Sequence, residues 1–306
     1  MLITDPPAKI TENLLMLGTT EYPLYLIRGE QQAAIFEGGT GAMGPLVGEQ
    51  LEQLAIDPGL VKQIVIPHAH PDHVMAVAML REMCPDAAVL ASEPAAAVLS
   101  NEKAIGFFCK VDAAITAALA ESGTITDEHR PKPLAEMKIA VDRQIARGDK
   151  VTVDGLSFDV LETPGHSDCS LSFHQPDQRI LIISDAAPYL MPDCKSWWPC
   201  YFTGYAPYLA SMRTLAQLDA EILCLGHRAV VRGAEEIKTY FEETIAATEQ
   251  YHRQIIDEIT GGESIRQLAE RLGSEAFEKT GWLPLDFFQK NCNLLIKQSL
   301  EHEGME

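Results

Sequence analysis

One short segment of the sequence is dense in side chains that bind metal ions. From His68 to His73 it reads His-Ala-His-Pro-Asp-His. In an extended segment, residues two apart project to the same side, so His68 and His70 can hold one ion together. Asp72 and His73 follow where a helix would begin, and can face a second ion. Imidazole and carboxylate suit zinc, iron or manganese. We therefore predict a metal centre here rather than a polar loop of solvated histidines.

Three further candidate ligands stand at the ends of apolar strands later in the chain. His166 lies in Thr-Pro-Gly-His-Ser, Asp185 ends Ile-Leu-Ile-Ile-Ser-Asp, and His227 ends Ile-Leu-Cys-Leu-Gly-His. A lone His or Asp at a strand end is more often a hydrogen-bonded turn residue. Because all three residues follow the first motif in this order, they together indicate one metal centre that is assembled from distant parts of the chain.

These motifs resemble, in order, those of the metallo-β-lactamase superfamily over about residues 10–232. The ligand set that the resemblance implies is His68, His70 and His166 for one metal, Asp72, His73 and His227 for a second, and Asp185 as the bridge. Two positions depart from the family pattern. Pro67 stands where Thr is usual, and Arg228 stands where Gly is frequent. Neither departure removes a ligand.

The resemblance also implies a hydrolase with two divalent metal ions. Such ions, about 3.5–4 Å apart, share a water and lower its pKa toward neutrality, so that hydroxide attacks an electrophilic carbonyl. Asp185 would hold the spacing, and Asp72 could take the proton of the nucleophile. A Gly-x-Ser-x-Gly elbow, which would mark a serine hydrolase, does not occur in the sequence.

Short strands and intervening helices are expected to position these residues. The run 61–66 is apolar-rich along its whole length, which is typical of a central strand buried on both faces. The predicted strands are 14–17, 24–28, 33–36, 61–66, 87–90, 150–153, 157–162, 171–173, 180–184 and 222–225. The predicted helices among them are 45–55, 74–83 and 208–218.

Two long segments have helical composition. Residues 93–148 are rich in Ala, Glu, Lys and Arg, and we expect them to be mostly helical, with breaks near Gly123 and at two prolines. After Gly233, apolar residues recur at three- and four-residue spacing and give one stripe. We expect that helix to end at 261–262, Ser264 to cap the next, and a last helix to span 285–300.

The expected fold is α+β, a four-layer αββα sandwich with the site at one edge of two sheets. Residues 1–232 would form the catalytic domain, with the helical insertion at about 93–148. Residues 233–306 would form a helical C-terminal extension packed on it. Both additions are expected to cover the metal cleft and enclose a pocket. The rival role for them is a homodimer interface, and both roles can hold together.

Aromatic residues after Asp185 and in the last helix could line that pocket and contact an acyl or aromatic group of the substrate. The alternative is that these residues pack in the core. Arg228 places a cation beside the site, unless it pairs locally. The candidate pocket residues are Trp197, Trp198, Tyr201, Phe287, Phe288 and Arg228.

The amino-acid composition limits the classes of partner that we expect this protein to bind. Acidic residues number 44 and basic residues 24, and the net charge of −20 disfavours nucleic acid and anionic membranes as partners. The sequence contains no apolar run near the roughly 20 residues of a membrane span, and its start does not read as a signal peptide. The seven cysteines are scattered and odd in number, which indicates reduced thiols. We expect a cytoplasmic protein with a small-molecule substrate.

The layout is also similar to that of the 2-aminobenzoylacetyl-CoA thioesterase of bacterial quinolone signalling. The similarity rests on the first motif, Gly-His-Ser-Asp at 165–168, Asp-Ala at 185–186 and the helical additions. It makes a CoA-type thioester the first choice of substrate. Such an anion would need local cations, for which Arg228, Lys195 and the Arg and Lys residues of 130–150 are candidates. The alternatives are a lactonase or small phosphodiesterase, a mono-iron persulfide dioxygenase, and a non-enzymatic sensor or partner-binding protein.

Overall fold

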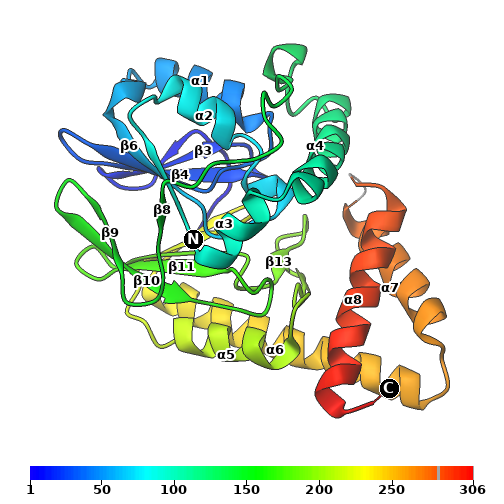
Figure 1. Cartoon of the computed structure of the whole chain (residues 1–306). Helices are drawn as coiled ribbons and strands as arrows, with labels where there is room; N and C mark the ends of the chain where they lie inside the picture. Colours follow the sequence, from blue (N-terminus) through cyan, green and yellow to red (C-terminus); the bar gives the residue numbers. More distant parts are fainter. Residues whose placement is uncertain (281–282, 306) are drawn as a thin grey trace.

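The computed structural model describes residues 1–280 and 283–305 and forms a four-layer αββα sandwich (Figure 1). Two sheets of seven strands each pack face to face between helical layers. The upper layer in Figure 1 holds α1 (Met43–Gln53) and α2 (Val77–Met83), and the lower layer holds α5 (Tyr205–Leu215) and α6 (Ala234–Thr260). This confirms the expected α+β class and sandwich.

The first sheet contains β2 to β8 in chain order. Its strands are β2 (Ala8–Lys9), β3 (Leu14–Gly18), β4 (Pro23–Arg28), β5 (Ala33–Phe36), β6 (Val61–Val65), β7 (Ala88–Ala91) and β8 (Arg143–Gln144). Strands β2 to β5 pair antiparallel, and β5 to β8 pair parallel. Parallel neighbours need crossover connections, and α1 and α2 lie in the first two of these.

The second sheet has the order β1-β16-β15-β12-β11-β10-β9. Its strands are β1 (Leu2–Ile3), β9 (Lys150–Val153), β10 (Leu156–Glu162), β11 (Leu171–Gln175), β12 (Ile180–Ser184), β15 (Ile222–Leu225) and β16 (Val230–Arg232). Only β12 and β15 pair parallel, and α5 lies in the crossover between them. A separate hairpin joins β13 (Tyr189–Leu190) to β14 (Trp197–Trp198).

Aromatic side chains fill the core between the two sheets. The Phe36 ring lies 5.0 Å from that of Phe158 and 5.1 Å from that of Phe173, measured between centroids. The buried Tyr25 hydroxyl donates a hydrogen bond of 2.5 Å to the carbonyl of Leu225. This bond ties β4 to the end of β15, where a candidate ligand follows. The two sheets are therefore fixed relative to each other next to the site.

The insertion differs in part from the expected helical segment. Residues 93–121 form α3 (Glu93–Leu99) and α4 (Glu102–Glu121), with Asn101 as N-cap of α4. After the short 3₁₀ helix η3 (Asp127–His129), residues 130–142 form no regular element, and 143–144 form β8. The prediction of helix was wrong there, because Pro131 and Pro133 each lack a backbone N–H and disfavour helix at the preceding residue. Two other 3₁₀ helices are η1 (Pro58–Leu60) and η2 (Pro71–His73).

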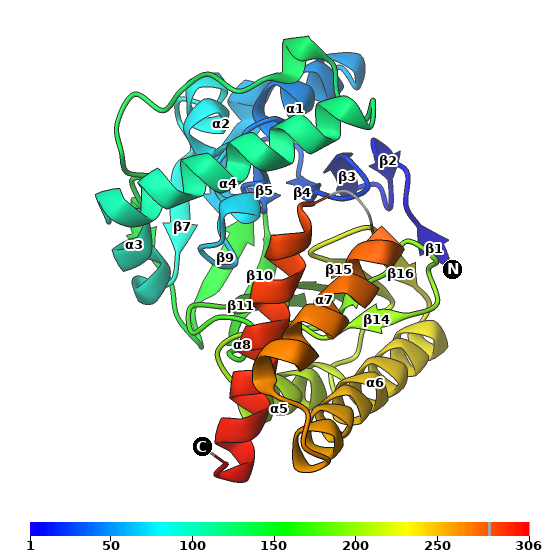
Figure 2. The same cartoon turned by 90° about the vertical axis from the view of Figure 1, so that its right-hand side faces the viewer.

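The C-terminal segment is helical, as expected. The stripe of α6 packs inward with Phe241, Thr248 and Ile255 buried, and α6 contacts β14, β15 and β16. Helices α7 (Ile265–Thr280) and α8 (Leu285–Glu303) pack against each other beside the sandwich (Figure 2). The hydroxyl of Ser264 accepts a bond of 3.3 Å from the N–H of Gln267, which is the expected cap of α7.

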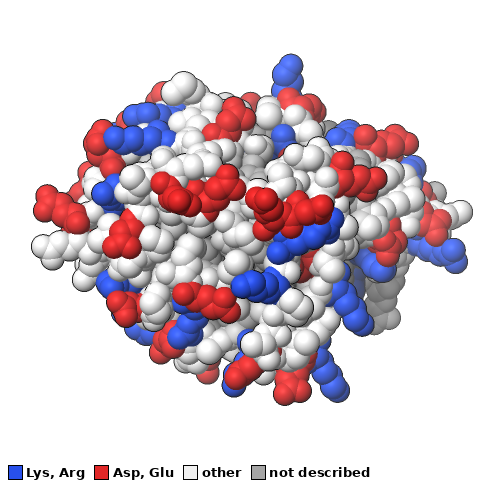
Figure 3. Space-filling model, turned by 90° about the horizontal axis from the view of Figure 1, so that it is seen from above, with Lys and Arg blue, Asp and Glu red and all other residues white. Residues whose placement is uncertain are grey.

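The surface and the helices bear on the question of partners. Acidic and basic side chains are interspersed on the face shown in Figure 3, so charge of neither sign is gathered in one broad area of that face. Within residues 1–280 and 283–305, no helix combines the length and apolarity that a membrane span requires.

Candidate metal centre

Strand ends and one tight turn place all seven candidate ligands at one edge of the sandwich. His68 and His70 follow β6, with His70 in extended backbone, and both Asp72 and His73 lie in η2, which Pro71 begins. The remaining ligands, His166, Asp185 and His227, follow β10, β12 and β15. The C-terminal ends of four strands thus meet where the two sheets adjoin, which is why residues almost 160 positions apart come together.

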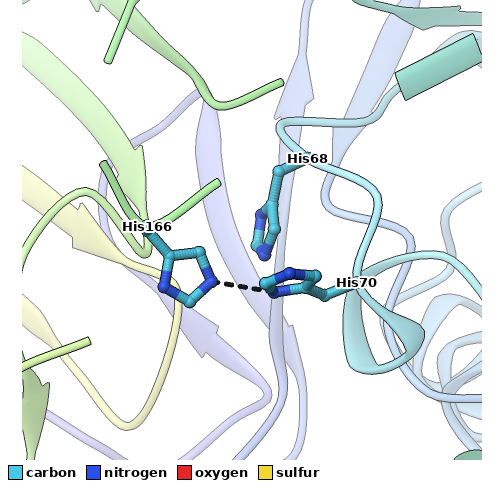
Figure 4. A group of neighbouring side chains, drawn as sticks. All are labelled: His68, His70 and His166. Atoms are coloured by element: carbon cyan, nitrogen blue, oxygen red, sulfur yellow. Dashed lines mark hydrogen bonds between the residues drawn. The ribbon is translucent and has the colours of Figure 1, made fainter. Parts of the chain in front are cut away.

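The first group consists of His68, His70 and His166, whose ring nitrogens lie within 4.8 Å of one another (Figure 4). The rings come from opposite sheets, and Nε2 of His166 lies 2.9 Å from Nδ1 of His70. His68 and His166 are almost fully buried, with exposed fractions of 1% and 2%. Three imidazoles converging on one point are able to bind a single ion.

The second group consists of Asp72, His73 and His227, also within 4.8 Å. Oδ2 of Asp72 lies 3.5 Å from Nε2 of His73 and 3.6 Å from Nε2 of His227. Two imidazoles and one carboxylate offer the donors for a second ion.

Asp185 lies between the two groups. Its Oδ2 is 3.3 Å from Nε2 of His166 and 3.4 Å from Nε2 of His73. Its Oδ1 is 3.4 Å from Nε2 of His227, while His68 Nε2 is 3.8 Å from Oδ2. A carboxylate that lies this close to both groups is positioned to bridge two ions held by them.

Each of four histidines is oriented by a bond to the ring nitrogen that faces away from the site. The four contacts are His68 Nδ1 to Ser184 Oγ at 3.2 Å, His73 Nδ1 to Glu37 Oε2 at 2.7 Å, His166 Nδ1 to the Cys200 carbonyl at 2.9 Å and His227 Nδ1 to the Glu21 carbonyl at 2.7 Å. Metal-binding histidines are oriented by such outer partners, which fix the tautomer. Nε2 of all four rings therefore points into the site.

The donor distances fit bound metal. Ligands about 2.0–2.1 Å from a tetrahedral ion lie roughly 3.3 Å from each other, and the contacts of Asp185 range from 3.3 to 3.8 Å. Nε2 of His68 and Nε2 of His73 are buried and have no hydrogen-bond partner. Buried polar atoms without partners are costly, and a metal ion would satisfy both. Nitrogen and carboxylate donors suit zinc, iron or manganese.

The electrostatics of the site favour charged carboxylates. Burial raises the pKa of Asp72 and of Asp185, but the surrounding histidines outweigh it and hold both pKa values below the usual range. Burial, followed by the neighbouring His166, lowers the pKa of His70 to about 3. Burial also lowers the pKa of His227, but Asp185 outweighs it and raises the pKa to about 9. At neutral pH the site therefore offers two anionic carboxylates and a neutral His70.

Close backbone packing fixes Asp185. Gly226, the residue before His227, lies against its carboxylate, and a Cβ at this position would overlap Oδ1 of Asp185. The backbone N–H of Gly226 also donates to the carbonyl of Ser184 at 2.9 Å. Position 226 therefore requires glycine, because only a residue without a Cβ leaves room for the carboxylate of Asp185 on the neighbouring strand.

The centre adjoins a cavity of about 430 Å³, and three of the candidate pocket residues line it: Trp198, Phe287 and Phe288. Five of the candidate ligands line it too: His70, Asp72, His166, Asp185 and His227. Helices α4 and α8 supply walls, so the insertion and the C-terminal segment do shape the pocket, as expected.

Three candidate pocket residues are not part of the lining. Trp197 packs edge-on against Tyr240 at 5.1 Å, because neighbouring residues of a strand point to opposite sides and Trp198 takes the inner one. Tyr201 is fully buried, and its hydroxyl bonds Ser299 on α8 at 2.9 Å. Tyr201 therefore packs in the core, and Trp197 packs against the core while partly buried.

Arg228, the third, pairs locally rather than facing the cavity. Its guanidinium bonds Oε1 of Glu21, and Oε2 of the same carboxylate accepts a bond of 2.8 Å from the hydroxyl of Tyr189. Because the carbonyl of Glu21 holds His227, this network supports a candidate ligand instead of contacting substrate.

Glu37 is the functional residue that the sequence analysis missed. Its buried carboxylate bonds His73 at 2.7 Å, and its backbone adopts a left-handed conformation with φ 81°. The available signal was its position directly after β5, since the other candidates also follow strands. Glycine-rich neighbours made it look like an ordinary turn residue.

Comparison with known proteins agrees with this geometry. Residues 23–227 match the model of the metallo-beta-lactamase superfamily. A hydroxyacylglutathione hydrolase of Cereibacter sphaeroides is 27% identical over 206 residues, which is 65% of this chain and 63% of that protein. The chain thus spans less than two thirds of this relative's length.

Solved structures share the fold. A metallo-beta-lactamase family protein from Thermus thermophilus has a TM-score of 0.64 at 20% identity, with 99% of this chain and 94% of that chain covered. A subclass B3 metallo-beta-lactamase of Bradyrhizobium japonicum has a TM-score of 0.60 at 18% identity, with 85% and 98% covered. Motif order, site geometry and the match to the family model agree, and the chain belongs to the metallo-β-lactamase superfamily.

Proposed function

We propose that this protein is a metal-dependent hydrolase of a small thioester or ester, with a CoA-type thioester as the first choice. The observation that carries the proposal is the convergence of seven candidate metal-binding side chains, five of which line an apolar cavity. His68, His70 and His166 would hold one divalent ion, and Asp72, His73 and His227 a second, with Asp185 between them. Ions at these positions would lower the pKa of a water and polarise the scissile carbonyl.

The protein's own groups would orient the reactants and take the proton. Asp72 is ionised and lines the cavity, so its carboxylate is available to accept a proton from the attacking water. Water adds to the carbonyl carbon, the C–S bond breaks, and a carboxylic acid and a thiol result. A thiolate is a good leaving group, so little general-acid assistance is needed. The enclosing walls keep the acyl group beside Asp185.

The sequence relative favours a thioester over the rival substrates. Hydroxyacylglutathione, the substrate in its name, is a thioester. A phosphodiester would call for cations, and among the described residues that line the cavity outside the metal-binding groups the one cationic side chain is Lys290. It lies on α8 and is 76% exposed, which places it away from the buried metal-binding groups.

The test is an assay of purified protein loaded with zinc, iron or manganese. Thiol release would be followed with acyl-CoA thioesters, beside a lactone and a phosphodiester. We expect metal-dependent thiol release, which His166→Ala abolishes. The matched control is His174→Ala, because His174 bonds the Asp219 carbonyl outside the site. Metal-dependent cleavage of the phosphodiester without thioester or ester turnover would overturn the proposal.

A further inference from the structure

The cavity beside the metal-binding groups has two apolar walls that face each other. Helix α4 supplies Phe107, Val111 and Ile115, while α8 supplies Phe287, Phe288 and Leu294. Both helices lie on the same side of the sandwich in two perpendicular views (Figures 1 and 2). The volume of about 430 Å³ is within the roughly 300–1,000 Å³ of small-molecule sites. The space is therefore large enough for an apolar group of substrate size.

The mouth of this cavity exposes large apolar side chains. Phe107 on α4 is 60% exposed and Leu294 on α8 is 39% exposed, and both belong to the lining. A single exposed apolar residue needs no explanation, whereas several that converge on one site mark a ligand-binding surface. A ligand that extends from the metal-binding groups to this mouth would cover both side chains.

Charge is scarce along the same walls. Among the described lining residues that α4 and α8 supply, the one charged side chain is Lys290, and Asp286 pairs with it at 2.7 Å. The proposed cations Arg228, Lys195 and those of 130–150 are not among the lining residues. An amide or carboxylate taken between these walls would lose its water, and among the described lining residues of α4 and α8 only Lys290 and Asn291 could replace it, which is unfavourable. The peptide-like arm and phosphates of a thiol carrier are therefore better left outside.

We propose that the substrate has a neutral, apolar acyl group of medium length, alkyl or aryl, which lies between α4 and α8, while the polar thiol carrier lies outside these two walls. This inference rests on the proposed thioester hydrolysis and names its substrate class. Helix α8 lies outside residues 23–227, the part that matches the family model. The α8 wall therefore lies outside the region shared with the family model, and the substrate of the hydroxyacylglutathione hydrolase is not carried over to this chain.

A chain-length series tests the inference. Metal-loaded protein would be assayed with acetyl-, butanoyl-, hexanoyl-, octanoyl- and phenylacetyl-CoA, beside a hydroxyacylglutathione. We expect kcat/KM to rise about fourfold per added methylene, which corresponds to about 0.8 kcal/mol of burial, until the cavity is full. Octanoyl-CoA would then exceed butanoyl-CoA by about two orders of magnitude. A flat series, or hydroxyacylglutathione as the best substrate, would overturn the inference.

A pair of variants locates the selective wall. Phe107→Asp should lower the ratio of octanoyl to acetyl turnover about tenfold, because it places a charge at the apolar mouth. Met137→Asp is the matched control: Met137 is 48% exposed, follows α4 in the same insertion and does not line the cavity. It should leave the ratio unchanged. An unaltered ratio in Phe107→Asp would contradict the assignment of α4 as a wall.

Binding of octanoate separates this inference from the proposed function. Trp198 lines the cavity, so octanoate should change tryptophan fluorescence, and Phe107→Asp should weaken that binding about tenfold. If octanoate binds in this way but no thioester is cleaved, the hydrolase proposal fails and the apolar site stands. If thioesters are cleaved regardless of acyl length and octanoate does not bind, the apolar site fails and the hydrolase proposal stands.

Discussion

The buried pair of Glu37 and His73 makes a sharp prediction about the second metal position. Glu37 Oε2 lies 2.7 Å from Nδ1 of His73, and both side chains are at most 2% exposed. Glu37→Gln retains an oxygen that can accept the imidazole N–H but removes the negative charge behind the ring. Any change in metal affinity therefore reports the charge rather than the geometry.

The expected size follows from the behaviour of outer partners in metal sites. Loss of such a partner weakens metal binding about 10- to 100-fold, which equals about 1.4–2.7 kcal/mol. The effect should fall on the ion held by Asp72, His73 and His227. The other group, which contains His68 and His166, does not contact Glu37 through a hydrogen bond and should keep its affinity.

The assay is a calorimetric zinc titration of metal-free protein, with wild type showing two binding steps. Glu37→Gln should weaken one step only. Glu49→Gln is the matched control, since Glu49 bonds Nε2 of His129 at 2.9 Å and is half-exposed outside the site. Two unchanged steps in Glu37→Gln, or an equal loss in Glu49→Gln, would refute the assigned role of Glu37.

Three other changes have defined outcomes. Asp112 on α4 accepts a 2.6 Å bond from the N–H of Gly41, and burial raises its pKa from 3.8 to about 6. Its ionised form therefore disfavours folding, a cost that is absent below pH 4 and grows as the pH rises through 6. The free energy of unfolding of Asp112→Asn should exceed that of wild type by up to about 3 kcal/mol at pH 8 and should equal it at pH 4. Urea unfolding of both proteins at each pH would measure this difference, and equal stabilities at pH 8 would contradict the prediction. Gly226→Ala should displace Asp185 and lower kcat about 100-fold. Gly106→Ala is the control and should leave kcat unchanged, because a Cβ at Gly106 would have no neighbouring atom within 4 Å. A fully active Gly226→Ala variant would argue against the role of Asp185. Chelation should abolish hydrolysis and added metal restore it, and turnover that persists in metal-free protein would exclude a metal-dependent reaction.

The sequence was most informative where the chemistry restricts residue type. Histidines and aspartates at strand ends could be recognised as candidate ligands because few other residues bind such ions, and the apolar strands before them have strong patterns. Strands such as 33–36, 150–153, 180–184 and 222–225 agree with the structure at both ends. Short strands such as β1 and β16 have too few residues to form a recognisable pattern.

Other features depend on contacts between distant segments. The side chain of Trp198 points inward and that of Trp197 points outward because the two residues form a short paired strand, and the sequence does not reveal this pairing. Alanine-rich composition correctly indicated α4, and breaks near Gly123 and at the two prolines were expected, but composition did not show that residues 130–142 form no regular element. The burial of Glu37 depends on where β5 ends relative to η2, so only the folded arrangement identifies it.

Anomalous X-ray scattering from crystals of the metal-loaded protein, recorded on both sides of the metal absorption edge, would locate bound ions directly. We expect two peaks, one enclosed by His68, His70 and His166 and the other by Asp72, His73 and His227, with Asp185 between them. A single peak, or ions bound elsewhere while these side chains keep their positions, would contradict the dinuclear centre on which the proposed hydrolysis depends.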